Sequence, residues 1–200
     1  MSATPIPAAC AHRPRRGGLV VPYLSFEHND AVAFGTADPI KRDRCFEHRL
    51  CQICENPLER RFYVVVRPQD VGFGYAPEPG LHPPCLQYSE RACPMLNGTA
   101  ETYREGGVSR SHPALRTCAD PDCRRCAAGF GQRGPERTAS AAPDWDAWML
   151  PLDAYQLRRD GGKILGISLD LAPLRIRRIL VSPERESALR MIAALADLGR

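Results

Sequence analysis

Four residues in the middle of the chain have the types and the spacing of metal ligands. Two residues separate Cys51 from Cys54, and after a gap of 27 residues His82 and Cys85 repeat that spacing. Two thiolates so spaced can reach one ion at about 2.3 Å where the chain turns sharply between them. A helix beginning at the second pair would direct both of its ligands to the same point, and its positive end would favour a thiolate. Four ligands with no open position predict a structural Zn²⁺ site rather than a catalytic one.

Ordinary burial is the alternative for these residues, with the cysteines in a core and the histidine at the surface. A single pair of cysteines would also fit a redox role, but the second pair at the head of a predicted helix favours a metal site. A folding unit of about 45 residues builds only a small core, so a bound metal would supply stability that packing cannot.

Three further cysteines, Cys118, Cys123 and Cys126, form a second group of soft ligands. Their spacing matches the start of a plant-type ferredoxin pattern, but no cysteine follows Cys126 to complete an iron–sulfur cluster. With His112 or Cys93 as the fourth ligand, the group would instead hold a second Zn²⁺. A loop with reactive thiols and no metal is the other interpretation, and the sequence leaves both open.

The histidines argue against a nuclease of the HNH type. Such a nuclease needs a histidine general base beside a metal-binding His and Asn, in a stretch such as Asp-His-x-x-Pro soon after the first cysteine pair. Residues 55–80 contain no histidine, His48 precedes the pair, and His112 lies far beyond it. The chain also lacks a Gly-rich phosphate loop, carboxylates with convincing spacing and a Ser-His-Asp arrangement. These absences favour a protein that is not an enzyme, without deciding the question.

Short apolar runs bounded by turn residues predict the elements before the first cysteine pair. Residues 19–26 and 31–36 flank the turn signal Asn29-Asp30 and predict a β-hairpin. The charged stretch 38–50 predicts a connection with a helical turn.

The elements between and after the cysteine pairs are predicted by propensity and by proline and glycine. The β-branched and aromatic run 61–67 predicts a strand. Three prolines and three glycines predict a loop over 68–80. Residues 81–93 predict a helix whose prolines lie in its first turn, and Pro94 ends it.

The C-terminal segment is more regular. Residues 145–152 and 164–171 predict strands, and 174–181 alternates in part, as a strand whose arginines face water. Ser182, Pro183 and Glu184 give a helix start, because a serine cap, a first-position proline and an acid near the positive end all favour one. Apolar residues then keep helical spacing to the end of the chain.

The order of turn, strand, loop and helix head, with two ligands from each end, resembles a treble-clef zinc module over about residues 50–93. The stretches RLCQICENPL and LHPPCLQYSERACPML, with the valine-rich strand between them and a Trp-containing C-terminal segment, are similar to a group of uncharacterised actinobacterial and phage-associated Cys-rich proteins. That group carries C-Q-x-C-G-x-P, then H-P-x-C, then a helix ending in C-P, and the similarity covers roughly residues 19–97. Glu55 and Asn56 stand here where that pattern usually has glycine. The resemblance implies no activity.

These predictions combine into an α+β fold class: a small treble-clef-like zinc module with short strands, plus a C-terminal strand–strand–helix segment. Residues 1–18, rich in Ala, Pro and Arg, are expected to be a disordered N-terminal lead. The zinc-binding module spans 19–97, and 98–143 is a loop or linker that carries the second cysteine group. Residues 144–200 are expected to pack on the module.

Charge and composition do not select a partner by themselves. Basic residues number 27, of which 25 are arginine, against 23 acidic residues, and no segment has the basic run of a nucleic-acid tail. The nine cysteines are an odd number, so a closed disulfide framework cannot use them all, and their clustering predicts metal first. The N-terminus lacks the long apolar region of a secretory signal, and no stretch approaches 18 uninterrupted apolar residues, so a cytoplasmic protein without a membrane span is expected.

These features favour a non-enzymatic, zinc-stabilised interaction protein that binds a protein or nucleic-acid partner. Five arginines would meet phosphates in the second case: Arg60, Arg61, Arg91, Arg124 and Arg125. The alternative is a thiol-based redox switch or accessory enzyme that uses Cys118, Cys123 and Cys126. Cys10 and Cys45 have no partner that the sequence identifies.

Overall fold

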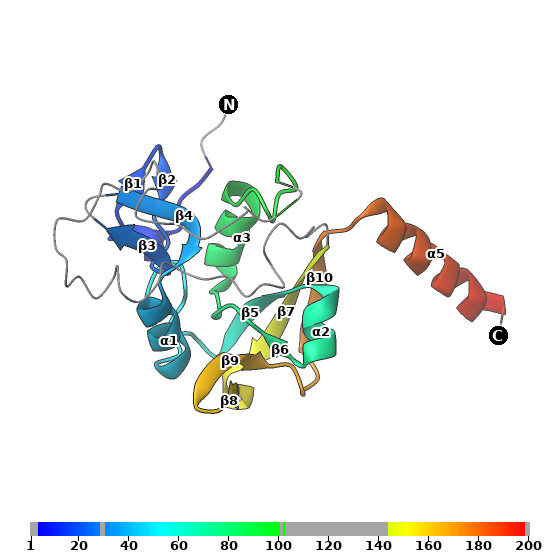
Figure 1. Ribbon diagram of the computed structural model, residues 1–200. Helices are drawn as coiled ribbons and strands as arrows, with labels where there is room; N and C mark the ends of the chain where they lie inside the picture. Colours follow the sequence, from blue (N-terminus) through cyan, green and yellow to red (C-terminus); the bar gives the residue numbers. More distant parts are fainter. Residues whose placement is uncertain (1–3, 29–30, 101, 103–143, 199–200) are drawn as a thin grey trace.

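The computed structural model describes residues 4–28, 31–100, 102 and 144–198, which form a mixed α/β fold of small antiparallel sheets (Figure 1). The strands are β1 (Arg15–Arg16), β2 (Leu19–Val20), β3 (Ser25–His28), β4 (Ala31–Ala37), β5 (Arg61–Val66), β6 (Tyr75–Ala76), β7 (Trp145–Pro151), β8 (Leu157–Asp160), β9 (Lys163–Ser168) and β10 (Arg175–Leu180). The helices are α1 (Pro39–Glu47), α2 (Pro68–Phe73), α3 (Pro83–Ala92) and α5 (Pro183–Leu198), with 3-10 turns η1 (Ala8–Cys10) and η3 (Leu152–Ala154).

A three-stranded sheet in the order β10-β7-β5 forms the centre of the molecule. β7 pairs antiparallel with both neighbours, and Trp148 lies opposite Val64 on one side and Ile176 on the other. The strand β5 comes from the segment expected at 19–97, whereas β7 and β10 come from the segment expected at 144–200. The two segments therefore share one core, to which Val64 and Leu150 contribute fully buried side chains.

The second three-stranded sheet, in the order β6-β9-β8, contains a strand that the sequence did not predict. β8 reads Leu157-Arg158-Arg159-Asp160, so it has one apolar residue and no alternating pattern to reveal it. The sheet also requires Gly166, because a Cβ there would lie 2.1 Å from the backbone oxygen of Ala76. Glycine at this position allows β9 to approach β6.

The hairpin predicted from residues 19–26 and 31–36 is present in part, because β3 and β4 pair antiparallel but β3 begins only at Ser25. Leu19 and Val20 of the expected first strand form β2, which pairs with β1 instead.

The stretch after this hairpin differs from the expectation of a connection with a helical turn, because α1 is nine residues long. The Asp38 carboxylate accepts hydrogen bonds from the backbone N–H groups of Ile40 and Lys41 at 3.0 and 3.2 Å, and Pro39 occupies the first turn. This capping starts a full helix, which the charged composition of the segment does not predict.

Residues 68–80, expected to be a loop, contain α2 and β6. Asp70 accepts hydrogen bonds from the backbone and guanidinium of Arg67, at 3.0, 3.1 and 2.7 Å, and both residues are buried. The left-handed Gly74, with φ of 75°, ends the helix. One buried arginine–carboxylate pair thus orders a segment whose prolines and glycines predict irregular structure.

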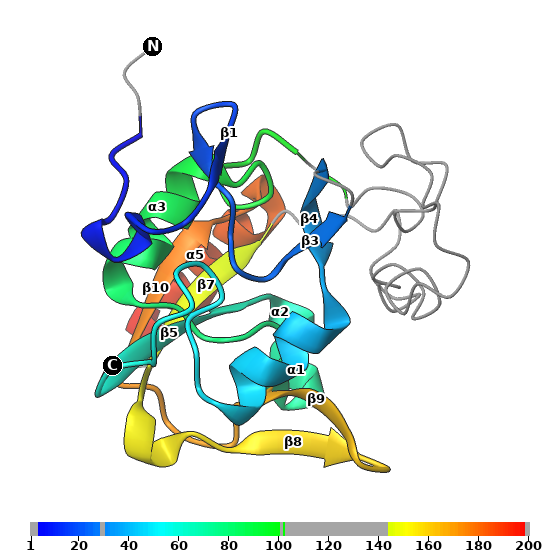
Figure 2. The same ribbon diagram turned by 90° about the vertical axis from the view of Figure 1, so that its left-hand side faces the viewer.

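The N-terminal lead expected over 1–18 to be disordered is ordered from residue 4 onward, so this prediction was wrong for the described part. It contains η1 and β1, and β1 pairs with β2. Cys10 is fully buried, and Ile6 and Ala9 pack against the main core. These contacts could not be predicted from the composition of the lead, because only three small or isolated apolar residues make them. Figure 2 shows this segment beside α3.

The C-terminal helix α5 extends away from the rest of the molecule (Figure 1). Its first turn is held by Arg185, whose guanidinium lies 2.6 Å from the Asp146 carboxylate on β7. Beyond this point Met191, Ile192 and Leu195 are 62–65% exposed. None of the helices in the described part of the chain is long and apolar enough to cross a lipid bilayer.

The arginines of β10 do not all face water as expected. Arg177 forms an ion pair with Glu90 of α3, whereas Arg175 and Arg178 are exposed. The β10 strand therefore ties the central sheet to the helix that carries Cys85.

Candidate metal centre

The first half of the site is a tight turn closed by backbone hydrogen bonds. The N–H of Cys51 donates to the carbonyl of Asn56, and the N–H of Glu55 donates to the carbonyl of Cys51, both at 2.9 Å. A β-bridge between Leu50 and Pro57 closes the base of the turn. Glu55 adopts φ of 68°, a left-handed conformation that favours glycine. The turn presents Cys51 and Cys54 on the same side.

The second half of the site is the beginning of α3. Tyr63 of β5 and Leu81 exchange two backbone hydrogen bonds of 2.8 Å, which fix the chain immediately before His82. His82 is the N-cap residue of α3, prolines fill its first turn, and Cys85 follows one turn later. The predicted helix is confirmed with its start at Pro83 and its end before Pro94. Because β5 follows the turn directly, it positions both halves of the site.

The four predicted ligands converge on one point. Their donor atoms, the sulfurs of Cys51, Cys54 and Cys85 and a ring nitrogen of His82, all lie within 4.8 Å of one another. The three cysteines are 0% exposed and His82 is 4% exposed. Within the described ranges this is the one group of side chains arranged to hold a metal. A Cys₃His set of this kind is compatible with a metal ion such as zinc.

The orientation of His82 suits a metal ligand. Its Nε2 lies 2.9 Å from the carbonyl oxygen of Pro57, which can only accept, so Nε2 carries the proton. Its Nδ1 lies 3.3 Å from the Cys54 sulfur and faces the cluster. A backbone carbonyl that fixes the second ring nitrogen is the usual support for a metal-bound histidine.

The protonation equilibria of the donors favour a cation at the centre of the cluster. Hydrogen bonds from Cys54 and Cys85 lower the pKa of the Cys51 thiol, so a thiolate is held there. Hydrogen bonds to Cys51 and Cys54 raise the pKa of Cys85, because a further negative charge beside them is unfavourable. Hydrogen bonds to the same two sulfurs raise the pKa of His82 to about 10. The cluster thus retains a proton on His82 where a metal ion would supply positive charge.

A fourth cysteine lies against the three cysteines and the histidine of the cluster, and sequence reasoning missed it. The Cys10 sulfur is 3.9 Å from the Cys85 sulfur, and both are fully buried. Burial raises the pKa of the Cys10 thiol. No spacing rule could have identified this neighbour, because 75 positions separate the two residues.

The remaining described cysteines lie elsewhere. Cys45 is fully buried in a small cluster with Tyr23 and Leu50, and burial raises its pKa to about 12. Cys93, considered as a ligand of the second site, is the C-cap residue of α3 and packs against the main core. The other predicted ligands of that site lie outside the described residues, so the second site stays a prediction: His112, Cys118, Cys123 and Cys126.

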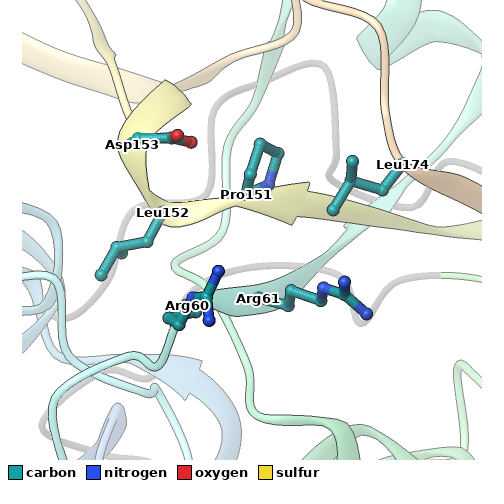
Figure 3. Close-up of a pocket in the computed structure, with 6 residues that line it drawn as sticks. All are labelled: Arg60, Arg61, Pro151, Leu152, Asp153 and Leu174. Carbon is teal, nitrogen blue, oxygen red and sulfur yellow. The ribbon is translucent and has the colours of Figure 1, made fainter.

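A pocket of about 300 Å³ lies at the end of the central sheet, near the entrance to β5 (Figure 3). Arg60 and Arg61 line one side, and the other side is formed by residues at the end of β7 and before β10. These are Pro151, Leu152, Asp153 and Leu174. Both arginines are exposed and form no ion pair within the described part of the chain.

The geometry therefore brings together all four residues predicted for the first site and adds Cys10 beside them. The actinobacterial and phage-associated resemblance stays a prediction, and so does the treble-clef assignment. Compared with protein-family models, curated proteins and solved structures, the chain matches none.

Proposed function

We propose that this is a non-enzymatic interaction protein, whose middle region is stabilised by a structural Zn²⁺ bound to Cys51, Cys54, His82 and Cys85. The observation that carries the proposal is the complete burial of a convergent four-donor set. Four protein ligands fill a tetrahedral zinc site and leave no position for a substrate or a reactive water. The metal then acts on folding, as in small domains whose cores are too small to be stable alone.

The order of elements supports a treble-clef-like module around this metal. A turn with two ligands leads into β5, which bridges back to Leu81, and the next residue opens α3 with the other two ligands. The chain between β5 and Leu81 is longer than a simple turn, because it contains α2 and β6.

A protein partner is the interaction that the C-terminal helix favours. Met191, Ile192 and Leu195 fall on a helical repeat of three and four residues and are all more than 60% exposed. Large apolar side chains gathered on one helix are the feature by which amphipathic helices bind protein grooves.

A nucleic-acid partner is the second candidate, and the arginine pocket favours it. Arg60 and Arg61 line the pocket together with apolar side chains and Asp153, and neither arginine forms an ion pair with the described residues. Phosphate contacts of this kind weaken steeply with salt, because bound counterions are released. Binding of labelled single- and double-stranded DNA and RNA, measured at low and moderate salt, distinguishes a nucleic-acid partner from a protein partner. Binding that falls steeply with salt and is lost in Arg60→Ala/Arg61→Ala supports nucleic acid.

Metal content tests the structural part of the proposal. Mass spectrometry of the native protein should show zinc, and Cys51→Ser should remove one equivalent, whereas Cys45→Ala should retain it. A Cys123→Ser variant reports on the second site, because loss of a further zinc there would establish a two-metal protein. Native protein without metal would contradict the proposal.

The partner surface is tested with a photo-crosslinking amino acid at Ile192 and, as a matched control, at the exposed position Glu186 on the opposite face of the same helix. A discrete cross-linked protein at position 192 alone supports a protein partner on the apolar stripe. Equal labelling at both positions contradicts it.

A further inference from the structure

The N-terminal arm, defined here as residues 4–24, contacts both halves of the metal centre. The backbone N–H groups of Tyr23 and Leu24 donate at 3.0 Å to the carbonyls of Ile53 and Gln52, which lie inside the turn that carries the first two ligands. At the other half, the backbone N–H of Val20 donates at 2.8 Å to the hydroxyl of Tyr88 on α3. The arm therefore bridges two elements that the metal also joins.

Cys10 is the point at which this arm reaches a ligand. It ends the 3-10 turn η1, where its N–H donates to the carbonyl of Pro7 at 2.8 Å and its carbonyl accepts from Arg13 at 3.0 Å. These bonds hold its sulfur 3.9 Å from the sulfur of Cys85, with no exposure to solvent. The hydrogen-bond partner that the described residues give this thiol is the ligand sulfur.

We propose that Cys10 is a positioning residue of the metal centre, whose S–H donates a hydrogen bond to the metal-bound Cys85 thiolate and so couples docking of the N-terminal arm to metal binding. The inference rests on the metal binding proposed above, but not on the identity of any partner. Cys10 is not a fifth ligand, since it lies outside the set of donors that are mutually within 4.8 Å, and zinc takes four.

The physical reason is the cost of a buried thiolate. The Cys85 sulfur has no access to water, so hydrogen-bond donors from the protein must compensate the negative charge that remains on it after metal binding. Residues that support a ligand in this way typically change metal affinity by about 10–100-fold when they are replaced. Because coupling between two equilibria is reciprocal, metal release should loosen the arm by the same factor.

Cobalt substitution tests the proposal, because Co²⁺ reports both affinity and thiolate bonding. Full-length wild type, Cys10→Ala, Cys10→Ser and the matched control Cys45→Ala are titrated with Co²⁺ against a competing chelator. Cys45 is also fully buried and packs with Tyr23 of the arm and Leu50 beside the first ligand, so its replacement leaves a comparable gap near the site while keeping the contact to the Cys85 sulfur.

The expected result is specific to the donor. Cys10→Ala should bind Co²⁺ about 10-fold or more weakly. Its sulfur-to-cobalt charge-transfer band should keep the intensity of three thiolates and move to lower energy, because a thiolate without its donor holds its electrons less tightly. Cys10→Ser, which keeps a donor, should restore affinity and band position. Cys45→Ala should match the wild type in both.

Hydrogen exchange gives a second readout for the arm. The amides of Val20, Tyr23 and Leu24 should exchange faster after chelation, and faster in cobalt-loaded Cys10→Ala than in cobalt-loaded wild type. If the alanine variant does not fold, the serine variant still tests the donor, because its hydroxyl must retain the wild-type affinity.

Four outcomes overturn the proposal. Unchanged affinity and band position in Cys10→Ala would make Cys10 a packing residue, and loss of one thiolate's intensity would make it a ligand. Equal loss of affinity in Cys10→Ser and Cys10→Ala would remove the role of the donor. If the wild type binds no Co²⁺, the proposed metal site itself is wrong. This result differs from the other outcomes, in which the metal binds but Cys10 is not a hydrogen-bond donor to Cys85.

Discussion

The region around β5 buries its large apolar side chains almost completely, whereas α5 leaves three of its own mostly in water. Phe62 and Val64 of β5 are 0% exposed, and Ile192 of α5 is 62% exposed. The first region packs against β7 in the sheet, against α3 and beside the four donors of the candidate metal site. The helix is anchored at its first turn, where Arg185 pairs with Asp146, and it continues without packing partners among the described residues.

The contrast separates apolar residues that stabilise the fold by burial from apolar residues that remain exposed on its surface. An apolar side chain that stays exposed contributes little to folding, because the hydrophobic effect acts only on surface removed from water. The region around β5 thus accounts for much of the stability, whereas the apolar stripe of α5 remains exposed. Each prediction below tests one side of this division.

Loss of the metal should have the largest effect. Structural zinc contributes roughly 10–16 kcal/mol in zinc-finger peptides, comparable with the whole stability of a small domain, about 5–15 kcal/mol. Chelation, or Cys51→Ser, should therefore abolish the tertiary near-ultraviolet circular dichroism and the cooperative thermal transition. The buried control Cys45→Ala should keep both. Identical unfolding midpoints for Cys51→Ser and wild type would remove the metal from the account of stability.

Truncation of one apolar side chain in each region should give opposite results. Phe62→Ala should lower the free energy of unfolding by about 3–5 kcal/mol, because it leaves a cavity beside Tyr155 in the core. Ile192→Ala should change it by less than about 0.5 kcal/mol, as expected for an exposed position. Urea unfolding of both variants measures the difference. A similar cost at the two positions would show that α5 packs in solution.

Two glycines compare the steric cost of an added methyl group with the stability gained when the unfolded backbone has less conformational freedom. A Cβ at Gly80 would lie 2.7 Å from Leu58 and 2.8 Å from Phe62, so Gly80→Ala should cost about 1–3 kcal/mol through overpacking. Gly72 in α2 has open space around it, so Gly72→Ala should stabilise the protein by about 0.4–1 kcal/mol. Denaturant midpoints measure the order of the two variants, and a reversed order would contradict the packing described for Gly80.

The smallest expected difference in stability between two matched variants concerns the backbone of Glu55. Its side chain lies near Arg13 and Arg44, at 3.5 and 3.8 Å, so both Glu55→Gly and Glu55→Ala remove the same ion pairs. Because φ is 68° there, glycine should be more stable than alanine by about 1 kcal/mol. Thermal unfolding of the pair isolates the conformational term. Greater stability of the alanine variant would mean that the turn relaxes to another conformation.

Local patterns allowed much of the candidate site to be predicted. The spacing of the four ligands, the β-branched run of β5 and the prolines at the start of α3 act within a few residues, and the structure places them as expected. Contacts between distant segments were not predictable in this way. Cys10 reaches Cys85 across 75 positions, and β8 gains its place by pairing with β9 rather than through its own apolar residues. The burial of Cys10 also explains why an Ala- and Pro-rich lead is ordered.

The position of β7 between β5 and β10 has a consequence for the order of events during synthesis. All four ligands have been made once Cys85 is added, but β7 begins 60 residues later, at Trp145. At about 5–20 residues per second, this interval lasts roughly 3–12 s. Throughout it a metal ion could bind while β5 has no sheet partner and its apolar side chains lack the cover that β7 provides. A nascent chain that captures its metal early would hold this edge in place until β7 arrives and would limit its association with other nascent chains.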